Sequence, residues 1–306
     1  MSQGRVLLTG SSGFIGSHLA EALLAAGYEV LALRRGSTSL HRIAGLTGPL
    51  SWANTDEAAW EKQVLVWQPE YLVHSAWLGV SASQRDDWDS QLTNLEFTMK
   101  LLQLLAAGPA KQVVALGSQA EYGNFHGRIA ETDPANPTTA YGAVKLATLD
   151  VLRAFCQAHS LTWHWLRVFA VFGPREDAHW FVSHVVTKLL SGQQLDLTAC
   201  EQRYDYTYVR DLARAVVSVL GAEASSSGLY NISANTALPL KDLVQTAQAL
   251  TQSNSEIKYG VLPYRPGQVM HLEGNADQFT RVFGPVATTP LPQALAETIN
   301  FVASSV

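Results

Sequence analysis

The sequence has few cysteines, no long apolar run and no excess of basic charge. Its two cysteines, Cys156 and Cys200, are far apart, which excludes a disulfide framework and gives no metal-ligand spacing, so we expect no metal site and two buried free thiols. No apolar run reaches the roughly 18 residues that a membrane-spanning helix needs. The net charge of -5 does not favour nucleic acid, whose binding proteins usually present a basic patch. We therefore expect neither nucleic acid nor a membrane as a partner.

The first residues, MSQGRVLLTG, lead directly into an apolar run. They lack the charged region followed by an apolar region that is typical of a signal peptide. We therefore expect a soluble cytoplasmic protein.

Short apolar runs alternate with helical patterns in the first half of the 306 residues. The runs predict strands at Arg5–Thr9, Glu29–Leu33, Tyr71–Ser75, Gln112–Leu116 and Thr162–Phe169, and the helical spacing predicts helices at Ile15–Ala26, Leu92–Ala106 and Ala140–His159. This alternation predicts an α/β protein with a Rossmann-type, doubly wound parallel sheet.

The pattern is looser in the second half, where we expect a smaller α/β C-terminal substrate lobe. Helices are predicted at Trp180–Leu190, Arg210–Leu220, Leu240–Thr251 and Pro292–Ala303, and strands at Tyr204–Val209 and Leu229–Ile232. The predicted domains are a dinucleotide-binding domain at 1–172, with segments near 204–232 packing back on it, and a substrate lobe at 173–306.

A glycine-rich turn, Gly10-Ser-Ser-Gly13-Phe-Ile-Gly16, follows the first predicted strand and opens the first helix. Glycines let the backbone approach a pyrophosphate, and the helix N-terminus supplies free N–H groups. In this context the turn indicates a dinucleotide site. A tight turn without a ligand is the alternative.

About twenty residues after such a turn, an acidic residue often binds the ribose of NAD. This chain carries Arg34 and Arg35 there, followed by Ser37. Guanidinium groups suit a 2′-phosphate because they form charge-assisted, often bidentate hydrogen bonds. The stretch predicts a preference for NADP(H), with NAD(H) as the alternative cofactor and two ligand-free surface arginines as the other interpretation.

Tyr141 and Lys145 are four residues apart on a predicted helix, so they share one face. A nearby ammonium lowers the pKa of a phenol, which can then exchange a proton with a carbonyl or an alcohol. Ser118, at the end of a predicted strand, is placed to hydrogen-bond the same substrate oxygen. The alternatives are an exposed helix pair and a turn serine.

Together and in this order, these motifs resemble the extended short-chain dehydrogenase/reductase family, in its branch that acts on nucleotide sugars. The resemblance covers nearly the whole chain. Further matching pieces are His74-Ser75-Ala76, Asn94, Arg167, Phe172-Gly173-Pro174-Arg175, Val209-Arg210-Asp211, Arg265-Pro266-Gly267, Ala276-Asp277 and Thr289-Pro290-Leu291.

The resemblance implies a role for each matching residue. Tyr141 is expected to be the general acid/base, with Lys145 lowering its pKa and binding the nicotinamide ribose, and Ser118 polarising the substrate oxygen. The expected cofactor residues, besides Tyr141, Lys145 and the Arg34, Arg35 and Ser37 stretch, are Gly10, Ser12, Gly13, Phe14, Ile15, Gly16, His74, Ser75, Ala76 and Phe169. The expected substrate contacts are Trp77, Ser118, Glu121, Arg175, His179, Arg203 and Arg265, the last on the nucleotide diphosphate. For Glu121, packing beside Tyr122 is an equal alternative. The family also implies a homodimer through a four-helix bundle of residues 92–106 and 140–159.

Departures from the family pattern bear on the reaction. Gln119 and Ala120 stand where the family's dehydratases carry Asp-Glu, which disfavours dehydration. Ala170 stands where many epimerases carry Asn, and Tyr204 separates an arginine and an aspartate that are usually adjacent. We predict NADPH-dependent reduction of a keto group, at C4, of a nucleotide-linked keto-deoxysugar. The alternatives are an NAD-dependent sugar 4-epimerase and, remotely, a non-catalytic NADP-binding regulator, which would typically lack the Tyr or the Lys present here.

Overall fold

The computed structural model of the chain describes residues 2–304 and divides into two compact units. The first unit is the chain up to Asn124 together with Glu131–Val168 and Ala213–Asn231; the second is Phe125–Ala130, Phe169–Leu212 and the chain from Ile232 on. The chain therefore passes between the units more often than a boundary at residue 172 with one returning segment implies.

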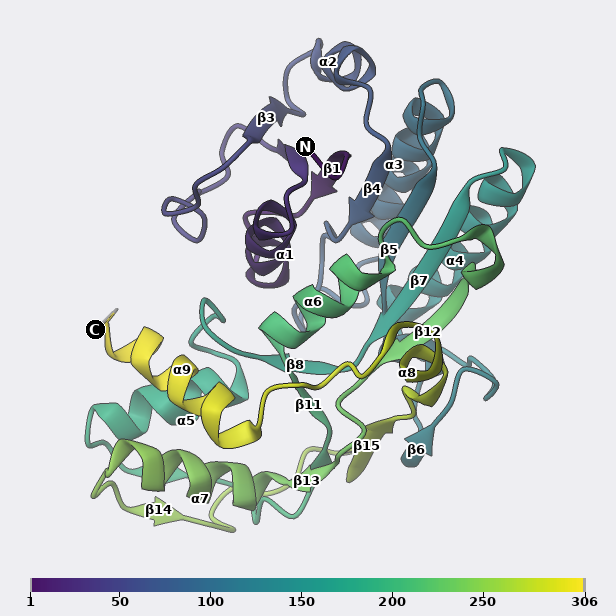
Figure 1. Cartoon of the computed structure of the whole chain (residues 1–306). Helices are drawn as coiled ribbons and strands as arrows, with labels where there is room; N and C mark the ends of the chain where they lie inside the picture. Colours follow the sequence, from purple (N-terminus) through teal and green to yellow (C-terminus); the bar gives the residue numbers. More distant parts are fainter. Residues whose placement is uncertain (1, 305–306) are drawn as a thin grey trace. The chain divides into compact units, whose positions relative to one another are not determined.

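The first unit is built around a seven-stranded sheet with the order β12-β7-β5-β4-β1-β2-β3 (Figure 1). Its strands are β1 (Arg5–Thr9), β2 (Glu29–Arg34), β3 (Leu50–Asn54), β4 (Tyr71–His74), β5 (Gln112–Ser118), β7 (Thr162–Val168) and β12 (Gly228–Ile232). Neighbouring strands from β3 to β7 are parallel, which confirms the predicted Rossmann-type sheet. The chain order reverses between β1 and β4, and open α/β sheets bind ligands beyond the carboxyl ends of the strands at such a point.

Helices cover both faces of this sheet: α1 (Phe14–Ala25), α2 (Trp60–Trp67), α3 (Trp88–Ala106), α4 (Ala140–Ala158) and α6 (Val209–Val219). Figure 1 shows α1 and α6 in front of the sheet and α3 and α4 behind it. Side chains fix where the two long helices begin, because Asp87 accepts the amide of Ser90 and Thr139 accepts the amide of Gly142.

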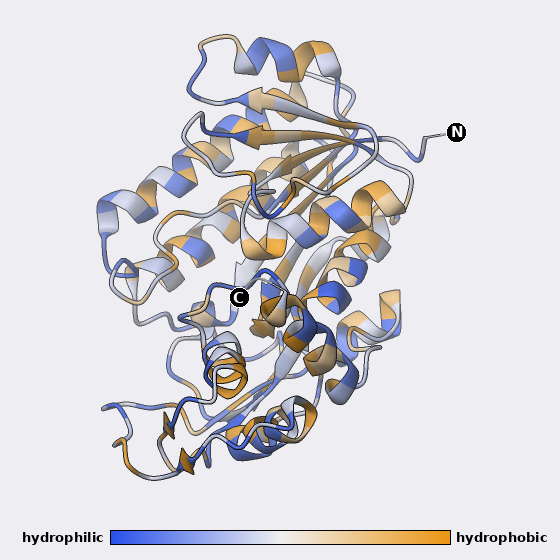
Figure 2. Cartoon of the chain, turned by 90° about the vertical axis from the view of Figure 1, so that its left-hand side faces the viewer, coloured by the Kyte–Doolittle hydropathy of each residue, from blue (hydrophilic) through white to orange (hydrophobic). Residues whose placement is uncertain are grey.

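The core of the first unit lies between the sheet and α2, α3 and α4. Leu72 of β4, Val113 of β5, Leu101 of α3 and Leu152 of α4 belong to one cluster and are fully buried. In Figure 2 the strands are largely in the colours of hydrophobic residues, whereas helices carry both colours. A strand buried on both faces reads as a continuous apolar run, which explains why the sequence predicted these strands.

The second unit combines short strands with the helices α5 (Phe181–Leu190), α7 (Leu240–Thr251), α8 (Asp277–Phe283) and α9 (Leu291–Ala303). Its four-stranded sheet has the order β13-β10-β15-β6, formed by β13 (Leu238–Pro239), β10 (Arg203–Tyr204), β15 (His271–Gly274) and β6 (Gly127–Ile129). Two further pairs are β11 (Tyr206–Tyr208) with β8 (Ala170–Phe172) and β14 (Ile257–Lys258) with β9 (Leu195–Asp196). Its core packs α5 and α7 together through Val185, Leu189, Leu240 and Val244.

Candidate active site

The glycine-rich turn joins β1 to α1 and contains two glycines, Gly10 and Gly16. A larger residue at either position would force nearby backbone atoms to move. Gly10 has a φ of +77°, and a Cβ there would lie 2.7 Å from the amide nitrogen of Ala76. A Cβ on Gly16 would lie 1.9 Å from the carbonyl oxygen of Gly10. The turn therefore packs tightly against the residues that follow β4, and the free N–H groups at the N-terminus of α1 lie at the end of the sheet, where they suit an anion.

Ser11, inside this turn, carries a buried hydroxyl that has no hydrogen-bond partner within residues 2–304. Buried polar groups are normally paired. An unpaired hydroxyl beside a helix N-terminus fits a site that takes a phosphate group of a dinucleotide.

His74 ends β4, and its ring belongs to a buried hydrogen-bond chain rather than to an open cofactor surface. The hydroxyl of Thr9 accepts the amides of Ser75 and Ala76 at 3.2 and 3.1 Å and lies 2.8 Å from Nδ1 of His74. Nε2 lies 3.0 Å from the hydroxyl of Thr98, which donates to the carbonyl of Asn94. Burial and then the charge of Lys145 lower the pKa of His74 to about 3, so the ring is neutral. Both ring nitrogens thus face protein groups, and the cofactor contact of His74 stays a prediction.

Ser118, Tyr141 and Lys145, the predicted catalytic residues, all lie in the first unit, at the end of β5 and in the first two turns of α4. Burial raises the pKa of Tyr141, and its hydrogen bond with Ser118 opposes that rise. Nζ of Lys145 donates to the carbonyl of Leu116 at 2.6 Å. Burial lowers the pKa of Lys145 to about 7, and the charge of Glu121 acts in the opposite direction. The structure thus brings a phenol, a hydroxyl and an ammonium to one edge of the sheet.

Residues 75–87, here the β4–α3 loop, pack against the start of α4. The carbonyl of Arg85 accepts the amide of Tyr141 at 2.8 Å, and the guanidinium of Arg85 lies 5.3 Å from the centre of the Tyr141 ring. Asp86 accepts the amide of Ala140 at 3.1 Å. The charge of Arg85 favours the phenolate of Tyr141, a contribution that no sequence motif indicated.

Glu121 lies in a short 3-10 helix, η1 (Gln119–Tyr122), and is fully buried. Its carboxylate accepts the amide of Ser118 at 2.8 Å, the indole N–H of Trp165 at 3.0 Å and Nε of Arg167 at 2.7 Å. These partners enclose both oxygens. The position therefore corresponds to the packing alternative rather than to a substrate contact, and Glu121 acts by fixing the backbone that carries Ser118.

Arg34, the last residue of β2, is half-buried, and Arg35 and Ser37 after it are exposed. The guanidinium of Arg34 lies 6.0 Å from the centre of the Trp52 ring. Its Nε is buried with no hydrogen-bond partner among the residues described. The sequence has no acidic residue at the end of β2, but Asp56, just after β3, brings a carboxylate to this segment and accepts the amide of Gly36 at 2.8 Å.

Five further predicted residues lie in the second unit: Phe169, Arg175, His179, Arg203 and Arg265. Arg203 is exposed and donates to the carbonyl of Ala237 at 2.7 Å. Arg265 is exposed, and its charge acts on Tyr204. The others are Arg175, which has a φ of 69°, His179, whose ring lies 5.2 Å from that of Trp180, and Phe169, which is buried against Phe125.

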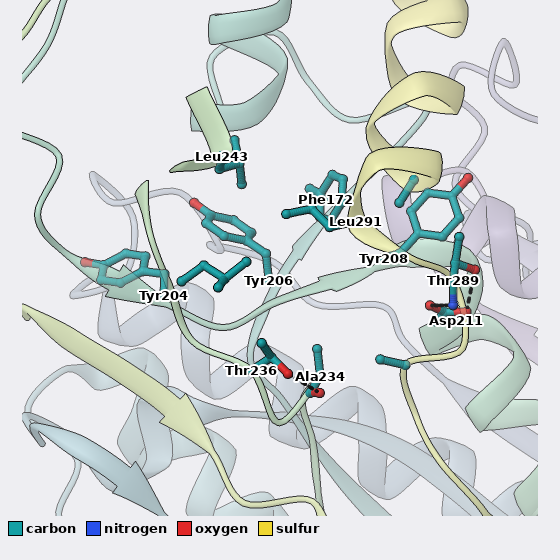
Figure 3. A pocket seen from close by; sticks show the side chains of 13 residues that line it. Phe172, Tyr204, Tyr206, Tyr208, Asp211, Ala234, Thr236, Leu243, Thr289 and Leu291 are labelled. Atoms are coloured by element: carbon teal, nitrogen blue, oxygen red, sulfur yellow. Dashed lines mark hydrogen bonds between the residues drawn. The ribbon is translucent and has the colours of Figure 1, made fainter. Parts of the chain in front are cut away.

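The second unit also has a pocket of about 170 Å³, partly open to solvent (Figure 3). Its lining is mostly aromatic and aliphatic, with Tyr204, Tyr206, Tyr208 and Phe172 among the side chains drawn there. The carboxylate of Asp211, which lines it, accepts hydrogen bonds from the amides and hydroxyls of Thr288 and Thr289. None of the predicted catalytic, cofactor or substrate residues lines the pocket.

Two kinds of feature are absent from residues 2–304. No group of three His, Cys, Asp or Glu side chains there is arranged to hold a metal ion. No helix in that range combines the length and the apolar composition needed to cross a membrane.

Known proteins resemble this chain over almost its whole length. CDP-abequose synthase from Salmonella muenchen is 24% identical over 282 residues, covering 91% of each chain. The dTDP-6-deoxy-L-talose 4-dehydrogenase (NAD(+)) from Aggregatibacter actinomycetemcomitans is 27% identical, covering 88% of this chain and 98% of the relative. Among solved structures, the UDP-glucose 4-epimerase from Thermotoga maritima with UDP-glucose has a TM-score of 0.87 at 23% identity, over 98% of this chain and 99% of that one. MoeE5 in complex with UDP-glucuronic acid and NAD has a TM-score of 0.85 at 27% identity, over 99% of this chain and 100% of that one.

The model of the NAD dependent epimerase/dehydratase family matches residues 6–233. That span contains the glycine-rich turn and the Ser118, Tyr141 and Lys145 set described above. The chain therefore belongs to the NAD dependent epimerase/dehydratase family and is an enzyme of the extended short-chain dehydrogenase/reductase type.

Proposed function

We propose that the protein reduces the C4 keto group of a nucleotide-diphosphate-linked keto-deoxysugar with NADPH. The observation that carries this proposal is the buried phenol of Tyr141, hydrogen-bonded to Ser118 and followed one helical turn later by the buried ammonium of Lys145. This is an arrangement for moving one proton to or from a substrate oxygen. The names of the two relatives, a CDP-abequose synthase and a dTDP-6-deoxy-L-talose 4-dehydrogenase, support deoxysugar chemistry at C4.

In this proposal the bound cofactor supplies a hydride to the carbonyl carbon. The hydroxyl of Ser118 donates a hydrogen bond to the carbonyl oxygen and orients it. Tyr141 gives its phenolic proton to that oxygen as negative charge develops there, so that the ketone becomes an alcohol. Lys145 stabilises the phenolate that remains, and Tyr141 then regains a proton from solvent.

The residues around the turn fit a dinucleotide. The N–H groups at the start of α1 and the unpaired hydroxyl of Ser11 suit the diphosphate. The unpaired Nε of Arg34 supports a 2′-phosphate at the end of β2. We propose NADP(H) as the preferred cofactor for this reason.

A 4-epimerase that retains NAD is the second candidate, and a specific observation favours it. The carboxylate of Asp56 lies against Gly36, in the same segment as Arg34 and Arg35. A carboxylate there repels a 2′-phosphate and suits an unphosphorylated ribose. The solved structure of MoeE5 is a complex with NAD, which is in line with this alternative.

A substrate panel separates the two candidates. Purified protein is mixed with the GDP-, CDP-, UDP- and dTDP-linked 4-keto-6-deoxyhexoses, and NADPH oxidation is followed by absorbance. We expect oxidation with at least one of them. No oxidation with any, together with interconversion of two hexose epimers without added cofactor, would establish the epimerase instead.

The cofactor preference is tested by the ratio of kcat/KM for NADPH to that for NADH. We expect the unmodified protein to favour NADPH and Arg34→Asp to reverse or flatten the ratio, because the new carboxylate repels the 2′-phosphate. Arg281→Asp, at an exposed position on α8, makes the same change in net charge and should leave the ratio unaltered. An equal ratio in the unmodified protein contradicts the assignment.

We also propose that the protein forms a homodimer in which α3 and α4 pair with the same helices of a second copy. Trp88 and Leu92 on α3 are large hydrophobic side chains that are 55% and 45% exposed. Helix α3 also packs against α4, so the two helices together offer a surface to a second copy. Sedimentation of the unmodified protein and of Leu92→Glu tests this. A dimer is expected for the first and a weakened dimer for the second, and a monomeric unmodified protein refutes the proposal.

A further inference from the structure

Trp77, in the β4–α3 loop, contacts both Lys145 and Tyr141. Nζ of Lys145 lies 3.6 Å from the centre of the Trp77 ring, well inside the roughly 6 Å within which a cation is attracted to an aromatic face. The ring of Tyr141 meets that of Trp77 edge-on, with centres 6.2 Å apart and an angle of 89°. One indole therefore touches the ammonium on its face and the phenol ring at the same time.

The orientation of Trp77 is fixed from α3. Its indole N–H donates to Oε1 of Gln91 at 2.8 Å. Gln91 is fully buried, and its Nε2 donates to the carbonyls of Gly79 and Gln84 at 3.0 and 3.3 Å. The side-chain amide of Gln91 is thus hydrogen-bonded both to the indole of Trp77 and to the backbone of the β4–α3 loop. These bonds restrict rotation of the indole, so its face stays against Lys145.

The surroundings of Lys145 leave the ammonium with few other stabilising groups. It forms no ion pair with a carboxylate among the residues described, and its hydrogen bond goes to the carbonyl of Leu116. Glu121 favours the charge from a distance, but that carboxylate is paired with Arg167. The other groups facing Lys145 are the neutral ring of His74 and, at 5.8 Å, the ring of Trp165. A buried ammonium in such a place tends to lose its proton.

We propose that Trp77 is a positioning residue that holds Lys145 as a charged ammonium beside Tyr141. The effect on catalysis rests on the proposed function, but the effect on Lys145 does not. A desolvated cation–π contact changes a protonation equilibrium about tenfold, which is about one pKa unit. Without it, Lys145 is neutral over more of the working pH range and no longer favours the phenolate of Tyr141. This role differs from the substrate contact that the sequence predicted for Trp77.

The direct test is the titration of Lys145 in the free protein. Lysines labelled with ¹³C at the ε carbon are followed by NMR from pH 5 to pH 11, and the Lys145 signal is identified by its loss in Lys145→Arg. We expect Trp77→Leu to lower the pKa of Lys145 by about one unit and Trp77→Phe to lower it by about half as much, because a benzene ring binds a cation more weakly than an indole. Trp67→Leu, which removes a half-buried tryptophan at the end of α2, should have no effect.

An unchanged Lys145 pKa in Trp77→Phe and Trp77→Leu overturns the proposal. If Trp77→Leu fails to fold, the proposal is judged on the pKa of Lys145 in Trp77→Phe alone. No turnover is involved, so absence of NADPH oxidation in the substrate panel leaves this result standing. In the active enzyme, we expect Trp77→Leu to reduce kcat about tenfold at pH 8 and much less at pH 6, where Lys145 regains its proton. An equal loss at both pH values contradicts a role through Lys145 and indicates lost packing.

Discussion

Replacing Glu121 with glutamine tests how strongly the buried charge pair next to Ser118 stabilises the protein. Glu121 is fully buried and Arg167 is almost so, with Nε and Oε2 2.7 Å apart. The carboxylate also accepts from the amide of Ser118 and the indole of Trp165. A glutamine keeps one acceptor oxygen, but it turns an NH₂ group toward groups that are themselves donors and leaves the guanidinium without a counter-charge.

The expected loss follows from the burial of the pair. Removing one partner of a buried ion pair costs about 3–5 kcal/mol, because the remaining charge is left uncompensated in a medium of low polarity. The matched control is Glu70→Gln. Glu70 pairs with Lys111 at 2.5 Å, but the lysine side chain is 63% exposed, so that change should cost at most about 1 kcal/mol.

The assay is urea unfolding followed by tryptophan fluorescence, which gives the free energy of unfolding of each variant. A further variant, Glu121→Leu with Arg167→Met, should recover only part of the loss: it leaves no buried charge, but the amide of Ser118 and the indole N–H of Trp165 lose their acceptor. If Glu121→Gln is no less stable than Glu70→Gln, the buried pair does not hold this part of the protein and the reasoning is refuted.

Three other residues give independent predictions. Tyr141→Phe should lower kcat by about 10²–10⁴-fold, the usual contribution of a general acid, with cofactor affinity unchanged by fluorescence titration; full activity would remove the mechanism. Burial lowers the pKa of His164 to about 4, below its unfolded value of about 6.5, so its contribution to stability is present above pH 6.5 and is lost as the pH falls. The decrease in unfolding free energy between pH 7 and pH 5 should therefore be about 2 kcal/mol smaller in His164→Gln, and an equal decrease would contradict this. Asp211 accepts from the backbone and side chains of Thr288 and Thr289, so Asp211→Asn should cost about 1–3 kcal/mol in urea unfolding; a change near zero would show that these bonds are dispensable.

The sequence predicted the central elements well because their hydrophobic patterns are strong. The helix predicted at Leu240–Thr251 has those bounds, and the strand predicted from Gln112 starts there and extends to Ser118. It did not predict β3 or α2. β3 alternates around a single buried residue at the edge of the sheet, and α2 buries only Trp60 and Val64. Elements that bury so little carry too weak a periodicity to be recognised. In the second unit, β11 lies within the strand predicted at Tyr204–Val209, whereas the two- to four-residue strands β6, β8, β9, β13, β14 and β15 were not predicted, because so short a run carries little periodicity.

Site residues could be predicted from the sequence when a motif determines their relative positions. They could not be predicted when their role depends on the direction of the side chain. The spacing of Tyr141 and Lys145 on a helix was enough to place them together. His74 at the end of β4 and Glu121 in η1 lie near the predicted edge of the sheet, but their positions in the sequence do not determine whether the side chain faces a ligand or the interior. Arg85 and Asp56 belong to loops without a motif, so no spacing in the sequence pointed to them.

The residues at the site divide into those that reach the reacting atoms and those that hold them, and the two groups should respond differently to substitution. In the proposed mechanism Tyr141 and Ser118 contact the substrate oxygen, and changing them should lower kcat with little loss of stability. Glu121 and His74 are buried among protein groups, and Trp77 is half-buried and held by Gln91. Changing one of these leaves buried partners unpaired, so stability and activity should fall together. The exception is the effect of Trp77 on Lys145, which changes with pH because it acts through a charge.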